Sequence, residues 1–451
     1  MYLRSDVVVE PLVDYFPAWL RSVAPVPAAD RLARVQVPRL EAYLSLPEAD
    51  DLRGLEAAAL LDVIKRDRTE MLGLAAAVSA AERMLSRQPA HADLVAMHRL
   101  LPEPLRGPAE LAYDNAGRPV LRIVEQLLYE GPAYDTGRQS LRLTRGRRAP
   151  LPWAPDEPRL PEPEAVDLPV PFRHPGVDEL FAARIRPADP VRLRATLPID
   201  NWQAPGLDRL FTPAPPARAG RHLRHGARLR YFGRSCLVLQ TPEVAVVTDP
   251  HLDPGSDFTL DDLPDHLDQV LITSGRPDHL ALGTLLQLRS RIGSVVVPRS
   301  SRGNPADPSI GLCLKALGFP LVEVDDLDEI PVGDGRIVAT PHQGGHDGRD
   351  VRAKSTYLLQ MAGATVFVGG RAAGLEPALY RRLRDRLGRV DMAFLGVPEG
   401  ACGVAAALDA DEAYVYGGDQ PSSAQIREFL RWCARHGITA EHLRGGREWS
   451  W

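Results

Sequence analysis

The pattern of apolar and polar positions divides the chain into three parts. Over residues 50 to 130, apolar residues recur at steps of three and four, first over residues 60 to 85 and again over residues 120 to 128. This spacing places them on one face of a helix, so it predicts an amphipathic helix or helix pair and then a further helix. Prolines at positions 102 and 104 separate the two stripes. We therefore expect residues 1–146 to form a mainly α-helical N-terminal domain.

A proline-rich part follows, over residues 147–225, and it contains many of the 42 prolines of the chain. Proline lacks an N–H donor and biases its neighbours toward extended backbone, so we expect a connector rather than a regular element at its start. The apolar residues Trp153, Val170 and Phe172 favour a strap packed on its own protein over a ligand for an SH3-like partner. A short helix is expected over residues 177 to 185.

From residue 226 onward the pattern is that of a sheet covered by helices. Three β-rich runs, RLRYFG, SCLVLQ and EVAVVT, are separated by short turns, as in a meander. Strands are then expected over residues 270–273, 294–298, 336–340, 355–361, 365–370, 392–396 and 413–417, and helices over residues 280–291, 310–317, 375–387 and 424–435. This alternation predicts an α/β domain with a mixed sheet core and helices packed outside it.

Composition and charge narrow the functional classes. The 451 residues suggest two or three domains, and 44% hydrophobic and 25% charged residues are typical of a globular protein. A formal net charge of -5 gives no reason to expect nucleic acid or an anionic membrane as partner. No apolar run approaches the roughly 20 residues of a membrane span, and from the acids and the proline in its opening residues we expect no signal peptide. The four cysteines form no CxxC pair, so we expect reduced thiols in a cytoplasmic protein.

One loop carries the candidate chemistry. The segment TSGRPDH, residues 273–279, follows the strand VLIT and opens a helix, which is where α/β proteins place reactive groups. It resembles the T-H-x-H-x-D-H signature of the metallo-β-lactamase superfamily. A GRSC turn at residues 233–236, where that family usually has G-H-A, and the TDP step at residues 248–250 extend the resemblance. It covers roughly residues 226 to 451.

The resemblance is nearest to the diiron aminoacyl β-hydroxylases, the subgroup that includes the oxygenase of chloramphenicol biosynthesis. It is carried by the opening YLRSDVVVEPLV, the helical N-terminal part, and the segments PHQGGHDGRDVRAK and GGRAAGLEPALYRRL. The resemblance implies an αββα sandwich after a helical N-terminal domain and a proline-rich connector. It further implies an amino-acid substrate tethered to a peptide-synthetase carrier domain, and an N-terminal domain used for dimerisation.

Carried over position by position, the metal ligands of that family are largely replaced. The positions that the resemblance assigns to the metal site are Ser274, Arg276, Asp278, His279, Gly345, His346 and Arg371. The first two signature histidines fall at Ser274 and Arg276, whereas Asp278 and His279 match the pattern. Two metal ions about 3.5 Å apart need roughly five anionic or imidazole ligands and a bridging carboxylate. This sequence therefore predicts no resident metal.

The other replacements support the same prediction. The glutamate typical of the subgroup falls at Gly345, next to the matching His346, and the bridging aspartate falls at Arg371. A guanidinium stays protonated and cannot ligate a cation, so Arg276 and Arg371 would repel an incoming metal and neutralise Asp278. The alternative is one iron or zinc ion held by Asp278, His279 and His346.

Other readings of these residues stay open. Asp278 and His279 are candidate catalytic residues, with His279 as a base and with Arg276 and Arg371 binding an anionic substrate. A purely structural reading has Asp278 capping a helix and His279 bonding a neighbouring loop. Further candidates with weaker support are His342, four positions before His346, Asp249 beside His251 as an orienting residue, and the loop carboxylates Glu399 and Asp419.

Three functional hypotheses follow. The first is a non-catalytic relative of the β-hydroxylases, a partner or ligand-binding pseudoenzyme of secondary metabolism. It would form a homodimer, or a heterodimer with an active paralogue, or bind a carrier-protein domain. The second is an enzyme with mononuclear or metal-free chemistry, either a hydrolase or an oxygenase, on an anionic or carrier-tethered substrate. The third is an ordinary dinuclear enzyme, and it is disfavoured because five of the 12 histidines lie before residue 226.

Overall fold

Two seven-stranded sheets form the centre of the C-terminal part of this computed structural model. The structure describes the chain except for residues 47–51, 147–155, 163, 198, 200–203, 217–221, 253–257, 301–302, 343–352, 371–375, 397–399, 418–421 and 445. The strand order of the first sheet is β14-β13-β12-β11-β10-β9-β22. Its strands are β9 (Arg228–Gly233), β10 (Cys236–Gln240), β11 (Ala245–Thr248), β12 (Leu267–Leu271), β13 (Ile292–Pro298), β14 (Leu321–Val324) and β22 (Arg447–Ser450).

The second sheet has the order β15-β16-β17-β18-β19-β20-β21. Its strands are β15 (Glu329–Val332), β16 (Gly335–Pro341), β17 (Ser355–Met361), β18 (Ala364–Val368), β19 (Met392–Leu395), β20 (Glu412–Val415) and β21 (Thr439–His442). Both sheets combine antiparallel hairpins with parallel crossovers, since β9, β10 and β11 pair antiparallel, whereas β11, β12, β13 and β14 pair parallel. The mixed sheet that the sequence predicted is confirmed.

The strands are apolar at nearly every position because each sheet is covered on both faces. Along β10, Leu237 and Leu239 belong to the core between the two sheets, whereas Cys236 and Val238 belong to the core on the outer face of the first sheet. A strand buried on both sides needs apolar residues of both parities. This explains why the run SCLVLQ shows no polar alternation.

Helices cover the outer face of each sheet, which completes the predicted αββα sandwich. The helices on the second sheet are α13 (Pro377–Leu387), α14 (Ala401–Ala407) and α15 (Ser423–Arg435), and those on the first sheet are α11 (Leu282–Leu288) and α12 (Ile310–Ala316). The predicted strands and helices of this part are all present, while β14, β15, β21 and β22 are additional strands. The C-terminal REWSW forms β22, where the indole of Trp449 donates to the hydroxyl of Tyr414 at 2.8 Å.

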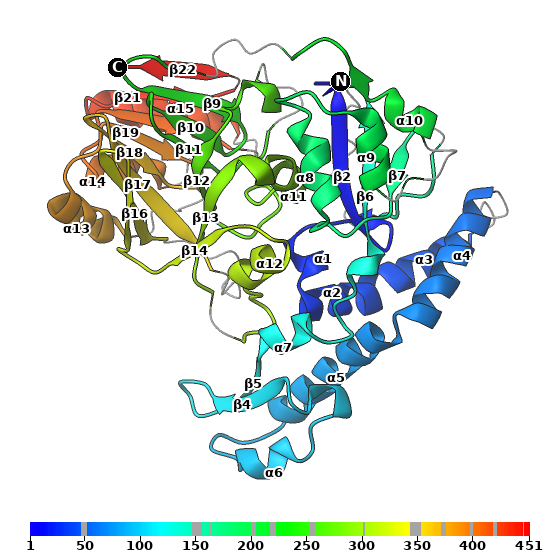
Figure 1. Cartoon of the computed structure of the whole chain (residues 1–451). Coiled ribbons are helices and arrows are strands. Elements are labelled where there is room, and N and C mark those ends of the chain that lie inside the picture. Colours follow the sequence, from blue (N-terminus) through cyan, green and yellow to red (C-terminus); the bar gives the residue numbers. More distant parts are fainter. Residues whose placement is uncertain are drawn as a thin grey trace.

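The N-terminal part combines helices with small sheets. Its helices are α1 (Leu20–Val23), α2 (Pro25–Arg31), a π-helical turn (Leu32–Gln36), α3 (Val37–Leu44), α4 (Leu52–Asp67), α5 (Thr69–Ser86), α6 (Leu94–His98) and α7 (Glu125–Tyr129). A four-stranded sheet has the order β3-β2-β6-β7, with β2 (Val7–Val13), β3 (Phe16–Pro17), β6 (Gln139–Arg145) and β7 (Val166–Leu168). Figure 1 shows α4 and α5 projecting from the body of the molecule as an arm. No described helix is long and apolar enough to cross a membrane.

The first predicted apolar stripe is confirmed, whereas the second is confirmed only for residues 125–129, which form α7, and is wrong for the residues before them. Met71, Leu74 and Val78 line the buried face of α5. In contrast, residues 119–123 form the strand β5 (Pro119–Ile123), which pairs antiparallel with β4 (Ala109–Tyr113). The physical reason is the turn between them, where the carboxylate of Asp114 accepts the backbone N–H groups of two turn residues and Gly117 has φ +72°. A tight turn of this kind favours a hairpin over a helix.

The short helix expected over residues 177 to 185 is confirmed as α8 (Pro175–Ala182), whereas the expectation of a connector without regular elements before it is wrong because β7 lies there. The proline-rich part contains β7, α8, α9 (Pro190–Thr196), α10 (Ala204–Asp208) and β8 (Phe211–Thr212), which pairs with β1 (Tyr2–Leu3). Proline is compatible with these short helices because it occupies the first helical position of α8 and of α9. The anchors Val170 and Phe172 are fully buried, whereas Trp153 lies outside the described residues.

The N-terminal part and the first sheet share one hydrophobic core. Residues such as Leu141, Phe172 and Phe181 pack in the same cluster as Val238 and Leu286. In Figure 1, α8 and β2 lie beside α11. This helix follows the loop of residues 273–279, TSGRPDH, which we call the signature loop. The division into residues 1–146, 147–225 and 226–451 stays a prediction. Strand pairing crosses the first of these boundaries, and the packing of side chains in one core crosses the second.

Candidate functional site

The candidate site lies where strands of both sheets end. Asp249 follows β11, and Thr273 begins the signature loop after β12. Gly370 follows β18 in the facing sheet, and a Cβ at that position would lie 3.1 Å from the hydroxyl of Thr273. The N–H of Gly396, after β19, donates to the carbonyl of Gly370 at 2.7 Å. The side chain of Tyr416, after β20, is buried near Asp249. The loops of the two sheets therefore meet at one point, as the carboxyl ends of parallel strands do in α/β proteins.

A buried hydrogen-bonded group forms the floor of the site. The carboxylate of Asp249 accepts two hydrogen bonds from Thr273, one from the backbone N–H at 2.8 Å and one from the hydroxyl at 2.6 Å. Oδ2 of Asp249 also lies 2.6 Å from Nδ1 of His279. The three residues are 0%, 1% and 2% exposed. Asp249 has φ +38°, a left-handed conformation that orients its carboxylate toward the next strand. Asp249 therefore orients His279, the role the sequence suggested for it, and Thr273 is a partner that the sequence did not reveal.

The charge of Asp249 decides how His279 is protonated. Burial alone would lower the pKa of His279, but the adjacent charge and hydrogen bond of Asp249 and the charge of Asp278 raise it. Because a carboxylate can only accept, Nδ1 of His279 carries the proton that faces Asp249. Nε2 of the same ring lies 3.7 Å from Oδ2 of Asp278. The arrangement matches the carboxylate–histidine pairs that orient metal-binding imidazoles.

Arg276 and Asp278 form an ion pair at the edge of this group. Nε of Arg276 lies 2.9 Å from Oδ1 of Asp278, and their side chains are 29% and 22% exposed. Burial would raise the pKa of Asp278, but His279 and Arg276 lower it below its ordinary value. Ser274 stands where the family resemblance expects the first histidine of the signature. It forms an isolated β-bridge with Lys354, and its hydroxyl accepts the N–H of Arg276 at 3.3 Å.

The expectation that Asp278 caps the following helix is wrong. α11 begins at Leu282, and its N-cap is Ala281, without a side-chain hydrogen bond. The chain makes a tight turn first, in which the N–H groups of His279 and Leu280 both donate to the carbonyl of Arg276. This turn is what leaves the carboxylate of Asp278 available for the guanidinium of Arg276.

His251 closes the site on the side of β11. Its Nδ1 lies 3.1 Å from the carbonyl of Pro277, in the signature loop. Burial, and then the charge of Arg234, lowers the pKa of His251 to about 4. The ring is therefore neutral near pH 7, and Nδ1 carries the proton because a carbonyl accepts only. The effect of Arg234 on the pKa of His251 shows that a cationic group lies close to the site. The sequence had indicated only that this residue lies in the GRSC turn.

The described side chains do not by themselves form a metal site. They contain no group of three or more His, Cys, Asp or Glu side chains that could hold a metal ion. Asp278 and His279 lie close enough to act together, but a guanidinium at position 276 and a hydroxyl at position 274 do not replace imidazole ligands. His342, which the structure describes, directly follows β16. The remaining candidates lie outside the described residues, namely Gly345, His346, Arg371, Glu399 and Asp419.

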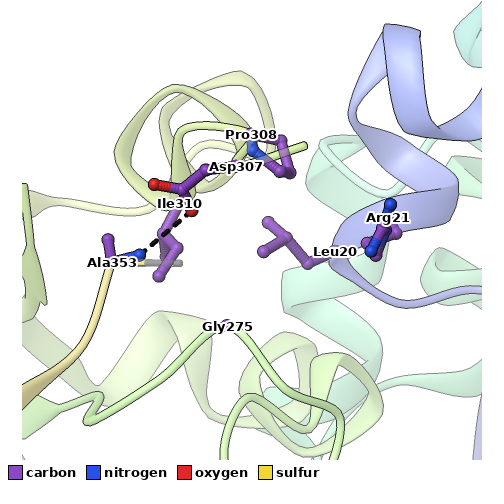
Figure 2. Close-up of a pocket in the computed structure, with 7 residues that line it drawn as sticks. All are labelled: Leu20, Arg21, Gly275, Asp307, Pro308, Ile310 and Ala353. Atoms are coloured by element: carbon purple, nitrogen blue, oxygen red, sulfur yellow. Dashed lines mark hydrogen bonds between the residues drawn. The ribbon is translucent and has the colours of Figure 1, made fainter. Parts of the chain in front are cut away.

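A small pocket adjoins the signature loop at the boundary with the N-terminal part. It is lined by Leu20, Arg21, Gly275, Asp307, Pro308, Ile310 and Ala353. Figure 2 shows Leu20 extending from α1 into the space between Gly275 and Ile310. A Cβ at Gly275 would lie 2.5 Å from Cδ2 of Leu20, so glycine is the residue that allows this close packing. The N-terminal part therefore contacts the loop that carries Arg276 and Asp278.

Comparison with known proteins matches both parts of the chain. Residues 2–215 match the diiron non-heme β-hydroxylase N-terminal domain family. Residues 228–416 match the β-lactamase superfamily domain. The first match covers the helices, the small sheets and most of the proline-rich part, and the second covers most of the sandwich.

Whole-chain relatives agree with these matches. The 4-amino-L-phenylalanyl-(CmlP peptidyl carrier protein) 3-hydroxylase of Streptomyces venezuelae is 28% identical over 429 residues, which are 88% of this chain and 80% of that protein. The crystal structure of CmlA, a diiron β-hydroxylase from the same organism, superposes with a TM-score of 0.89 at 25% identity and covers 100% of this chain and 99% of that one. A variant of the CmlA β-hydroxylase gives a TM-score of 0.88 at 26% identity, with 100% of both chains covered. The chain therefore belongs to the metallo-β-lactamase fold superfamily, in the subgroup of the diiron β-hydroxylases.

Proposed function

We propose that this chain is a β-hydroxylase relative that has lost most of its metal ligands and acts as a partner or ligand-binding protein in secondary metabolism. The observation that carries the proposal is the ion pair of Arg276 with Asp278, 2.9 Å apart. A carboxylate that is already neutralised by an adjacent guanidinium has no electrostatic need for a metal ion. A metal approaching this carboxylate would have to displace a permanent cation.

The buried floor of the site is consistent with a fold that is stable without metal. Asp249 is neutralised by His279, with 2.6 Å between the carboxylate oxygen and Nδ1. Asp278 receives Arg276 and lies near the same imidazole. Each buried carboxylate of the described site therefore has a cationic or hydrogen-bonding partner, as buried charges require. In this proposal Arg371 would add a second cation, and no metal cofactor is bound.

A second candidate function is an enzyme with one metal ion or with metal-free chemistry. The observation that favours it is the 3.7 Å distance between Nε2 of His279 and Oδ2 of Asp278, with Nδ1 of the same ring oriented by Asp249. In this proposal Asp278, His279 and His346 hold one iron or zinc ion. In the metal-free form, His279 acts as a base on an anionic or carrier-tethered substrate that Arg276 and Arg371 bind.

The partners follow from the relatives. The hydroxylase of Streptomyces venezuelae acts on an aminoacyl group attached to a peptidyl carrier protein. We propose that this chain binds a carrier-protein domain or an active paralogue of the hydroxylase, and that it forms a homodimer or heterodimer. The match of residues 2–215 to the N-terminal domain of that family supports the proposal, because it indicates that this chain has an N-terminal part similar to that of the hydroxylases.

Metal content of the purified protein tests the proposal. We expect plasma mass spectrometry to find well under one iron, zinc, manganese or cobalt ion per chain, both as purified and after incubation with ferrous iron followed by desalting. One tightly bound ion per chain would establish the mononuclear alternative, and two would refute the proposal.

Restoring the ligands provides the complementary test. A variant with Ser274→His, Arg276→His, Gly345→Glu and Arg371→Asp is expected to bind iron, since it again offers the ligands of the subgroup. The matched control adds Asp278→Asn to the same four substitutions and is expected to bind less iron. Equal, negligible binding by both variants would contradict the proposed ancestry of these four positions.

A further inference from the structure

Arg234 lies at the point where the two sheets meet over the candidate site. It occupies the turn between β9 and β10 with φ +48°, a conformation that non-glycine residues adopt at a cost of about 1 kcal/mol. The hydroxyl of Tyr231 donates to the carbonyl of Arg234 at 3.1 Å, and the hydroxyl of Thr248 donates to the next carbonyl at 3.3 Å. A Cβ on Gly417, after β20, would lie 4.0 Å from the same carbonyl of Arg234. The turn is therefore held between the ends of β11 and β20.

The guanidinium of Arg234 has no partner among the described residues. Its Nε is buried without a hydrogen bond, and within the described part of the chain neither an ion pair nor a hydrogen bond of its other nitrogens is found. Several other arginines also have a buried nitrogen without a partner, but each of them donates through another nitrogen. For example, Arg228 donates to the side chain of Gln240 and Arg230 to the carbonyl of Asp262. Arg234 is thus a half-buried cation without a counter-ion in the described part of the chain.

The charges around Arg234 show that it is not needed to neutralise the site. Asp249 is already paired with His279, and Asp278 is already paired with Arg276. The positive charge of Arg234 acts instead on His251, where it destabilises the protonated form of the imidazole and so lowers its pKa. A buried or half-buried cation without a partner costs free energy unless a ligand completes it. The backbone strain of the turn adds to this cost and is typical of positions retained for binding.

We infer that Arg234 binds the anionic group, a carboxylate or a phosphate, of a small ligand that enters the candidate site from the side of the turn between β9 and β10. Guanidinium groups bind both anions through paired N–H donors. This inference rests on the proposed function in one respect, since it takes the anion to be bound by arginine rather than by a metal ion. It assigns the anion to Arg234 rather than to Arg276, because the guanidinium of Arg276 already contacts a carboxylate.

Titration calorimetry with two probes tests the inference on the full-length protein. Inorganic phosphate and N-acetylglycine represent the two anionic groups, and each is titrated after dialysis against EDTA. We expect at least one of them to bind at one site per chain, and Arg234→Gln to raise its Kd about tenfold or more. Arg99→Gln removes an exposed arginine of the N-terminal part and is the matched control, expected to leave the Kd unchanged. The probe that binds more tightly identifies the class of anion.

Other results would overturn the inference. These are the absence of binding by either probe to the unmodified chain, or an equal Kd for Arg234→Gln and Arg99→Gln. If Arg234→Gln does not fold, modification of the unmodified chain by phenylglyoxal replaces it. Phosphate or N-acetylglycine should then protect Arg234 in the peptide map, and a lack of protection would count against the site. Metal content measured on the same samples keeps this test separate from that of the proposed function.

Discussion

At the scale of single residues, one histidine–carboxylate pair forms the buried part of the candidate site. His279 is oriented by Asp249 and Thr273 through contacts of 2.6 and 3.0 Å, which are as short as a working imidazole site requires. Three residues earlier in the same loop, Arg276 occupies a position to which the family resemblance assigns a metal ligand. The buried half of the candidate site thus holds a histidine paired with a carboxylate, and its outer half holds the ion pair of Arg276 with Asp278.

Removing the carboxylate of Asp249 tests the importance of this buried group. We expect Asp249→Ala to lower the free energy of unfolding by about 3–5 kcal/mol, because it leaves Thr273 and His279 buried without their acceptor. Urea unfolding followed by circular dichroism measures the change. Asp62→Asn, on the exposed face of α4, is the control and should change stability by less than about 0.5 kcal/mol. A loss for Asp249→Ala as small as that of the control would contradict the assigned role.

The neutral ring of His251 predicts how stability depends on pH. Its pKa is lowered from 6.5 to about 4 in the folded chain, so between these values the unfolded chain binds a proton that the folded chain does not. This contribution to stability is present above pH 6.5 and is lost as the pH falls toward 4. His251→Asn should remove up to about 3 kcal/mol of this dependence.

Urea unfolding at a series of pH values between these limits measures the effect of His251→Asn. His98→Asn, at an exposed position of α6, is the matched control and should keep the slope of the unmodified chain. The prediction is wrong if both variants retain the same dependence on pH.

At the scale of elements, the signature loop packs against α1 of the N-terminal part and α12 of the C-terminal part. Leu20 of α1 lies on one side of Gly275, and Ile310 of α12 lies on the other. The helix that follows the loop, α11, contacts β2 of the N-terminal part and α8 of the proline-rich part. A Cβ at Gly283 of α11 would lie 2.9 Å from the carbonyl of Val9. The position of Arg276 and Asp278 therefore depends on elements that are distant in the sequence.

A double-mutant cycle on Gly275 and Leu20 tests this packing. Gly275→Ala is expected to destabilise the chain by about 1–3 kcal/mol, because its Cβ would overlap the end of Leu20. Combining it with Leu20→Ala should recover part of that loss, so the two changes should be strongly non-additive in urea unfolding. Gly73→Ala in α5 is the control, since no atom lies within 4 Å of its Cβ, and it should stabilise the chain by about 0.5–1 kcal/mol. Strict additivity would argue against the contact.

At the scale of the whole molecule, the two family domains form one folding unit in the described chain. Arg184 donates to Gln287 at 2.8 Å and to the carbonyl of Val7, and Arg289 lies 2.9 Å from Asp178. These polar contacts join the proline-rich part, and Val7 of the N-terminal part, to α11 and its extension. Because residues of both of these parts pack in the same core as the outer face of the first sheet, the sandwich alone would expose part of its apolar surface.

Separating the two parts tests this dependence. We expect a fragment of residues 226–451 to be poorly soluble or to lack fixed tertiary packing, whereas the full chain should unfold in a single transition. Near- and far-ultraviolet circular dichroism during urea unfolding measures both properties. A fragment with sharp near-ultraviolet signals and cooperative unfolding would contradict the shared core.

The pattern of apolar residues by itself determined the α/β class with a mixed sheet, the order of most strands and the location of the signature loop, because these follow from local periodicity. The αββα layering was implied by the family resemblance, and the sequence also placed Arg276 and Asp278 two residues apart in one turn. Only the tertiary structure decided that residues 119–123 form a strand and that the proline-rich part contains β7. It alone brought Asp249 to Thr273, 24 residues away, and Arg234 to the same end of the sheets. The physical reason is that partner choice depends on which surfaces are buried together, and a local pattern carries no information about its distant neighbours.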